Sequence, residues 1–152
     1  MPVDLHLHSP ASDGTDSVPD RVNQANRYGL DKIALTDHDC ISEELEGRTR
    51  YIDGVEVVTG AEIKCEVDGT GIEILGYFLD PSDQEINRLF DELEMNRIER
   101  IETMIERVNT GENLDLSFEE VAQNGEGTVG RPHLADALID GGVTEDMDEA
   151  FQ

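Results

Sequence analysis

From Val3 to His8 the sequence alternates strictly between apolar and polar side chains. Because successive side chains of a strand point to opposite faces, residues 2–8 are predicted to form a strand with one apolar face. The other face carries His6 and His8, whose neutral imidazoles can both reach one metal ion. An H-x-H pair also occurs for structural reasons, so the pair taken alone leaves both interpretations open.

Further strand and helix signals follow up to residue 81. A loop rich in Ser, Asp and Gly precedes a helix that starts at Ser17 and stops at Gly29. We then expect a buried strand over 30–36, a short helix over 41–50, and strands over 54–58 and 71–78. Strands separated by helical pieces at this spacing predict an α/β fold, a partial barrel of about four largely parallel strands.

The chain changes character after residue 81. Apolar side chains at helical spacing predict one long amphipathic helix over 86–108. Ser117 and Glu120 have the spacing of a capping box, and Arg131-Pro132 is typical of the start of another helix. We therefore divide the chain into residues 1–81, which contain the strands, and residues 82–152, which form an all-helical insert.

The composition narrows the possible partners. The chain has 36 Asp and Glu residues against 11 Lys and Arg residues, a net charge of −25. Such a field repels duplex DNA and anionic membrane surfaces, and no stretch approaches the roughly 18 apolar residues of a membrane span. The acidic residues are spread over the whole chain, which we interpret as a halophilic, cytoplasmic protein whose charges are screened by salt.

More potential metal ligands follow the predicted strands. Asp13 lies just past the first strand, His38 past the second and Glu62 past the third. In βα architectures the carboxyl ends of the strands converge on one face, where active sites collect. Together with His6 and His8, these residues are therefore predicted to form one metal site.

Several short motifs resemble those of the PHP (polymerase and histidinol phosphatase) superfamily. They are DLHLHS at 4–9, SDG at 12–14, TDHD at 36–39 and GAE at 60–62, in that order and spacing. ILGY at 74–77 and GRPH at 130–133 are similar to the branch that dephosphorylates nucleoside 3′,5′-bisphosphates and trims short RNA from the 5′ end. The resemblance covers nearly the whole chain.

The resemblance implies a distorted barrel that holds up to three divalent ions, Mn foremost and otherwise Fe or Zn. By position, His6 and His8 would bind the first ion, Glu62 would bridge the first and second, and Asp13 with His38 would bind the third. The implied nucleophile is a metal-bound water, because clustered cations lower the pKa of bound water and hold phosphoryl oxygens. The implied partner is a small phosphorylated nucleotide or a short RNA end.

Four polar residues are candidates for contacts to substrate phosphate. Arg131 offers a planar fork that matches phosphate oxygens, and His133 beside it can donate as well. The alternative is that Arg131 only opens a helix. Ser9 and Ser12 can also donate to phosphate, although serines in a loop often serve the turn itself.

Two departures from the family pattern affect these expectations. Glu73 stands where the family has a histidine ligand, so either this carboxylate replaces it, which favours a harder ion such as Mn, or that ion site is weakened. The later family motifs, a histidine and an Asp-x-His, are absent, so we expect an N-terminal portion of a longer protein. An unclosed sheet should then leave an edge strand, and the helix face with Ile101, Met104 and Ile105, exposed or covered by self-association.

These motifs favour a metal-dependent phosphoesterase that hydrolyses phosphate monoesters. The alternative is a non-catalytic remnant that binds a metal or a nucleotide without turnover. The absent motifs and Glu73 favour that alternative.

Overall fold

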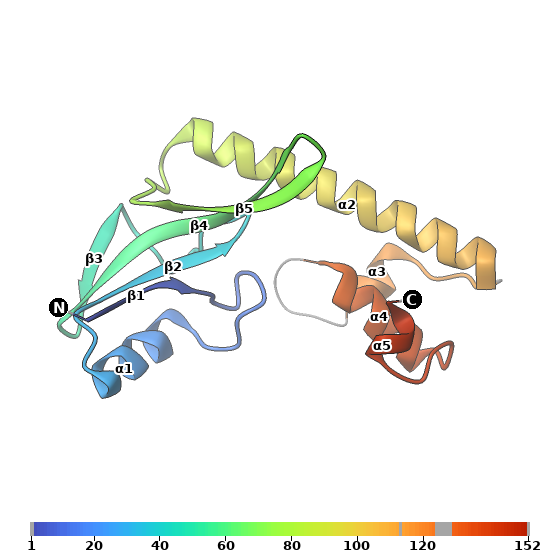
Figure 1. The fold of residues 1–152 in the computed structure, drawn as a ribbon, viewed down its shortest axis with the longest axis horizontal. Helices are drawn as coiled ribbons and strands as arrows, with labels where there is room; N and C mark the ends of the chain where they lie inside the picture. Colours follow the sequence, from blue (N-terminus) through green and yellow to red (C-terminus); the bar gives the residue numbers. More distant parts are fainter. Residues whose placement is uncertain (1, 113, 124–128, 152) are drawn as a thin grey trace. The chain divides into compact units, whose positions relative to one another are not determined.

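The structure, a computed structural model, describes residues 2–112, 114–123 and 129–151. Its elements in chain order are β1 (Val3–Leu7), α1 (Val18–Tyr28), β2 (Lys32–His38), β3 (Thr49–Ile52), β4 (Val55–Val67), β5 (Thr70–Tyr77), α2 (Gln84–Glu112), α3 (Phe118–Ala122), α4 (Arg131–Asp140) and α5 (Met147–Ala150) (Figure 1). The chain divides into two compact units, Met1–Glu92 and Leu93–Gln152. The division falls within α2, whereas the sequence pattern places it at residue 82. No helix in the described ranges is long and apolar enough to cross a membrane.

The first unit contains a mixed sheet of five strands. The strand order is β1-β2-β4-β3, and β5 pairs with the later part of β4. β1, β2 and β4 run parallel, whereas β3 and β5 run antiparallel to β4. Within the described residues β1 pairs only with β2, so the sheet is not closed. The predicted α/β class with an incomplete barrel is confirmed, with five strands and a mixed sheet.

The sequence prediction fails at residues 41–50. The predicted helix is wrong, because residues 41–48 form turns and Thr49–Ile52 forms β3. An Asp53-Gly54 turn, with φ values of 47° and 88°, folds β3 back onto β4. Asp68-Gly69, with φ values of 50° and 77°, joins β4 to β5 in the same way. Two-residue Asp-Gly loops favour β-hairpins, and this signal explains the antiparallel strands.

Helix α1 covers one face of the sheet (Figure 1). The side chain of Ser17 caps its first turn, and Gly29 ends it in the left-handed conformation, with φ of 69°. The apolar core between α1 and the sheet consists of Val18, Val22, Ala25, Ile33, Leu35, Leu45, Val55 and Val57. The β2 and β4 members of this core occupy odd-numbered positions. His38 and Glu62, at even positions, therefore point to the opposite face.

Tyr77 on β5 links the two sides of this sheet. It lies opposite Gly60, on the same face as Glu62. Its hydroxyl donates to the carbonyl oxygen of Leu5 on β1 at 3.0 Å, although β2 and β4 lie between the two strands. Three strand spacings of about 4.8 Å would separate them by roughly 14 Å in a flat sheet. The sheet is therefore curled, with the face that carries Glu62 on the inside.

The edge strand β1 is exposed, as expected for an unclosed sheet. Val3 and Leu5 keep 42% and 38% of their surface accessible. Unpaired strand edges can pair with another chain. Self-association through this edge stays a prediction.

The second unit has its own core on α2. Ile101 and Ile105 are buried against Val121 of α3 and Leu134 and Ala137 of α4, and Met104 packs at the edge of this cluster. The prediction that this helix face is exposed or covered by another chain is wrong. The reason is that α3 and α4 fold back onto the apolar stripe of α2 and bury it within the same unit.

Candidate metal centre

Three of the candidate metal ligands of the first unit lie in three neighbouring parallel strands, and His8 and Asp13 lie in the loop after β1. His6 lies in β1, His38 is the last residue of β2, and Glu62 lies in β4. His38 and Glu62 are direct register partners across the β2–β4 pair. The parallel register thus brings side chains that are far apart in sequence to one edge of the curled face.

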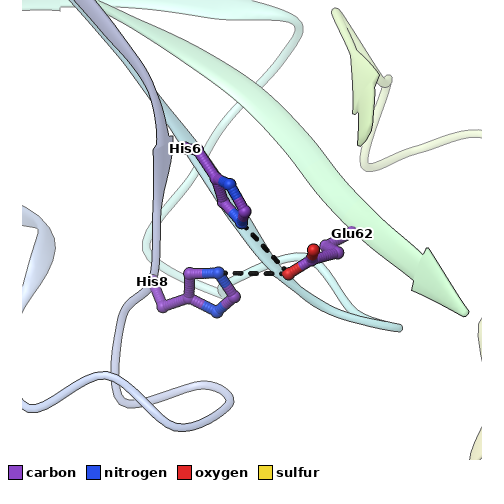
Figure 2. A group of neighbouring side chains, drawn as sticks. All are labelled: His6, His8 and Glu62. Atoms are coloured by element: carbon purple, nitrogen blue, oxygen red, sulfur yellow. Dashed lines mark hydrogen bonds and ion pairs between the residues drawn. The ribbon is translucent and has the colours of Figure 1, made fainter. Parts of the chain in front are cut away.

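The first group of ligand atoms is centred on Glu62. Figure 2 shows the imidazoles of His6 and His8 pointing at one oxygen of its carboxylate. The Nε2 atoms of His6 and His8 lie 3.1 Å and 3.3 Å from Glu62 Oε2. Glu62 is buried, whereas about half of the His6 side chain is exposed. The carboxylate at the centre of this group is therefore buried in the sheet, whereas the His6 side of the group is accessible to solvent.

The second group shares His8 with the first. The Nδ1 atom of His8 lies 2.9 Å from Asp13 Oδ1, and the Nε2 atom of His38 lies 3.5 Å from Asp13 Oδ2. The other ring nitrogen of His38 is 3.3 Å from Glu62 Oε2. In each group the ligand atoms lie within 4.8 Å of one another. Five of the six predicted ligands thus form one connected cluster.

The arrangement of His8 fits a bound cation. Both of its ring nitrogens face a carboxylate oxygen, of Asp13 on one side and Glu62 on the other. A neutral imidazole carries one N–H, so it can donate to only one of them. A divalent cation held by His8 and these carboxylates would accept the electron pair of the second nitrogen. Imidazole nitrogens with carboxylate oxygens are a ligand set that suits Zn, Mn or Fe.

Comparison with known proteins identifies the family. The family model of the PHP domain matches residues 4–105, which is more than half of the chain and includes all five ligands. This chain belongs to the PHP domain family. The chain is 32% identical to a 5′-3′ exoribonuclease of Haemophilus influenzae and 27% identical to a 3′,5′-nucleoside bisphosphate phosphatase of Chromobacterium violaceum. The alignments cover 98% and 99% of this chain and 54% and 53% of those relatives.

A solved structure agrees with this PHP assignment. It is that of a protein of Bifidobacterium adolescentis described as a metal-dependent phosphoesterase, with a TM-score of 0.73 and 31% identity. The match covers 98% of this chain and 53% of that one. This PHP chain therefore spans about half the length of the relatives that it matches.

Glu73 lies outside the metal cluster of this PHP domain. It is exposed on β5, opposite Lys64 of β4, and neither group of potential ligands in the described residues includes it. It shares the face of Glu62, but its partner Lys64 lies two residues further along β4 than Glu62. The structure therefore does not bring this predicted ligand together with the others.

Ser9 and Ser12 are engaged inside the PHP domain. Both side chains are buried, and both hydroxyls donate to the carboxylate of Asp37, at 2.8 Å and 2.7 Å. Asp37 itself is 1% exposed. Sequence reasoning missed Asp37 as a site residue. The signal that could have found it is a carboxylate at the end of an otherwise apolar buried strand, directly before a ligand.

Arg131 and His133 lie in the second unit, at the start of α4. The Nδ1 atom of His133 accepts the backbone N–H of Gly130 at 2.8 Å and thereby caps the helix. The guanidinium of Arg131 lies 4.9 Å from the centre of the Phe151 ring. The helix start that the sequence predicts is confirmed. Phosphate binding by these two residues stays a prediction.

Proposed function

We propose that this chain forms a divalent metal centre of a phosphoesterase. The observation that supports the proposal most is the convergence of three imidazoles and two carboxylates, with ligand atoms within 4.8 Å in each group. Bound divalent ions supply Lewis acidity to phosphoryl oxygens and activate water. Mn is the ion that we favour, because it accepts both imidazole nitrogen and carboxylate oxygen.

The chain's own residues take two roles in this proposal. His6, His8 and Glu62 hold one ion, and Asp13 with His38 holds another. The buried carboxylate of Glu62 faces all three imidazoles and fixes their spacing. The exposed side of His6 leaves room on that flank for a phosphate group. Glu73 belongs to neither group of potential ligands in the described residues, so we propose no role for it.

The substrate class that we infer is a 3′,5′-bisphosphonucleoside or a short RNA 5′ end. The names of the two relatives support this class. The net charge of −25 opposes the binding of long nucleic acids by a basic surface. Divalent cations held among these ligands reverse the field locally and attract one small phosphate.

We also propose that Arg131 binds a phosphate group. It lines an open cavity of about 290 Å³ in the second unit, together with Arg107. The other lining residues are Met104, Val108, Leu134, Ala135, Leu138, Ala150 and Phe151. Two guanidinium groups at an apolar groove without an acidic lining residue suit an anion with an apolar part, such as a nucleotide.

Metal content and hydrolysis together test the proposed function. The purified chain is loaded with Mn²⁺, and phosphate release from 3′-phosphoadenosine 5′-phosphate is followed with time. We expect bound metal and phosphate release, both lost in His8→Ala. Arg131→Gln tests the proposed phosphate contact and should weaken nucleotide binding. Arg27→Gln, which changes an exposed arginine on α1, is its matched control and should leave nucleotide binding unchanged. Absence of metal from the wild-type chain contradicts the proposal.

A second candidate function is metal or nucleotide binding without turnover. The position of Glu73 outside the cluster of potential ligands favours it. Stoichiometric Mn²⁺ without phosphate release supports this candidate. Phosphate release by the chain itself excludes it.

The acidic composition supports a proposal about the protein's surroundings. We infer a high-salt cytoplasm, because repulsion among 36 carboxylate residues is screened within about 3 Å at 1 M salt. Thermal unfolding measured from low to molar KCl should show a rising Tm. A Tm that is independent of salt contradicts this inference.

A further inference from the structure

A buried carboxylate lies beneath the metal cluster. Asp37 is the penultimate residue of β2 and is 1% exposed. Its odd position places its side chain on the sheet face opposite to that of its neighbour His38. None of the ion pairs among the described residues includes Asp37. Burying a carboxylate costs folding free energy unless it is hydrogen-bonded or paired with a cation. The hydrogen-bond donors to Asp37 are therefore needed to offset its burial.

Asp37 accepts three hydrogen bonds from the loop after β1. The backbone N–H of Ser9 donates to Oδ1 at 2.7 Å, and its hydroxyl donates to Oδ2 at 2.8 Å. The hydroxyl of Ser12 donates to Oδ1 at 2.7 Å. Short bonds to a charged acceptor are stronger than neutral ones. The loop and the end of β2 are therefore tied together at two points.

The loop is also held in a tight turn. The backbone N–H groups of Ser12 and Gly14 donate to the carbonyl oxygen of Ser9, at 3.1 Å and 3.0 Å. A Cβ atom at Gly14 would lie 2.4 Å from the carbonyl oxygen of His8, so only glycine fits there. The turn is thus closed by its backbone and attached to β2 by Asp37.

Each member of this network is the chain neighbour of a metal ligand. Ser9 follows His8, Ser12 precedes Asp13, and Asp37 precedes His38. The three neighbouring ligands are those of the second group. In addition, the hydroxyl oxygen of Ser12 lies 3.4 Å from His8 Nδ1. The hydrogen bonds to Asp37 therefore fix the backbone from which all three ligands project.

We propose that Asp37 is a positioning residue of the metal centre. By accepting hydrogen bonds from Ser9 and Ser12, it holds the loop so that His8 and Asp13 meet His38. Ser9 and Ser12 then act as donors to Asp37 and not to substrate phosphate. This inference rests on the metal centre of the proposed function.

Mn²⁺ affinity of the full chain tests the proposal. The probe is Mn²⁺ alone, titrated by calorimetry or by the electron paramagnetic resonance signal of free Mn²⁺. Asp37→Ala should lower the affinity by about 10- to 100-fold, the range typical of residues that orient metal ligands. Asp37→Asn should stay within about threefold of wild type, because its Oδ1 still accepts two bonds and its amide can donate to the hydroxyl of Ser9.

A core variant separates positioning from general destabilisation. Val22→Ala removes buried atoms from the α1 side of the same unit without touching the loop. We expect Val22→Ala to lower the Tm but to leave Mn²⁺ affinity unchanged. Asp37→Ala should lower Mn²⁺ affinity and, in addition, speed hydrogen exchange of the backbone amide of Ser9. If Asp37→Ala does not fold, Ser12→Ala removes one of the three bonds and should weaken Mn²⁺ binding about 10-fold, the lower end of the same range.

The outcomes distinguish this inference from the proposed function. Mn²⁺ binding like that of wild type in both Asp37→Ala and Ser12→Ala overturns the positioning role and leaves the metal centre standing. An equal loss of affinity in Val22→Ala overturns it as well. A wild-type chain that binds no Mn²⁺ overturns the metal centre, and the positioning role with it.

Discussion

The two units of the molecule place their functional side chains by different means. In the first unit, parallel strands bring His6, His38 and Glu62 together, although 56 residues separate the first from the last. In the second unit, Arg131 and His133 are neighbours on one helix turn, and the core lies beneath them. A sheet register therefore assembles a site from distant residues, whereas the helical unit presents residues that are already close in sequence. Changes in the first unit should alter metal binding, and changes in the second should alter stability or anion binding.

The largest expected effect is on the stability of the second unit. Ile101→Ala removes a fully buried side chain between α2, α3 and α4 and should cost about 3 kcal/mol of unfolding free energy. Urea unfolding followed by circular dichroism measures it. The exposed Met95→Ala on the same helix is the control. The candidate metal ligands all lie in the first unit. A loss of Mn²⁺ affinity in Ile101→Ala would therefore contradict the assignment of metal binding to the first unit alone.

Glu62→Gln should lower Mn²⁺ affinity and leave the stability of the second unit nearly unchanged. The variant keeps the shape of the side chain but removes the charge that faces three imidazoles. We expect Mn²⁺ affinity to fall about 100-fold, or about 2.8 kcal/mol, with little change in the unfolding of the second unit. Glu56→Gln is the matched control, since Glu56 lies on the same strand and pairs with Lys32. Equal effects of the two variants contradict the assignment of Glu62.

Tyr77→Phe tests whether the curl of the sheet matters to the site. The variant removes the hydrogen bond from β5 to the carbonyl oxygen of Leu5 and should destabilise the first unit by about 1 kcal/mol. Because Leu5 directly precedes His6, we also expect a small loss of Mn²⁺ affinity. Tyr51→Phe, on the exposed strand β3, is the control. A Tyr77→Phe variant with wild-type stability shows that the curl does not depend on this bond.

The smallest expected effect concerns the capping box of α3. Hydrogen bonds from the backbone N–H and the hydroxyl of Ser117 lower the pKa of Glu120 below its usual 4.5. A lowered folded-state pKa means that this stabilisation is present above pH 4.5 and is lost as the pH falls through the lowered value. Ser117→Ala should therefore reduce Tm by a few degrees at pH 7 and by less in acid. A Tm difference that grows in acid contradicts this sign.

Much of the fold could be predicted because local signals were strong. Ser17 and Gly29 bound α1 as expected, and the start of α4 follows from Arg131-Pro132. The helix predicted over 41–50 failed because the Asp53-Gly54 turn outweighed the helical composition before it. The exposed face predicted for α2 failed for a different reason. Which helices return to cover a stripe such as Ile101 depends on loop paths, and loop paths have no periodic signal.

That five of the candidate metal ligands lie close together could be predicted from sequence for a physical reason. Each of them lies in or just after a strand, and strands that are parallel neighbours end at one edge. Glu73 was a candidate ligand only through the family resemblance, and Ser9 and Ser12 were candidates because a hydroxyl can donate to phosphate. The sequence does not show the register of β5, which places Glu73 opposite Lys64 and leaves it exposed. It also does not show the burial that turns Ser9 and Ser12 toward Asp37.

The sequence by itself determined the candidate metal ligands of this PHP chain, the bounds of α1, the start of α4 and the acidic composition, because these depend on residue type and local spacing. Only the tertiary structure decided the mixed sheet, the curl through Tyr77 and the buried position of Asp37. The physical reason is that these features are hydrogen bonds between segments far apart in the chain. Their geometry follows from packing, and no local pattern in the sequence specifies it.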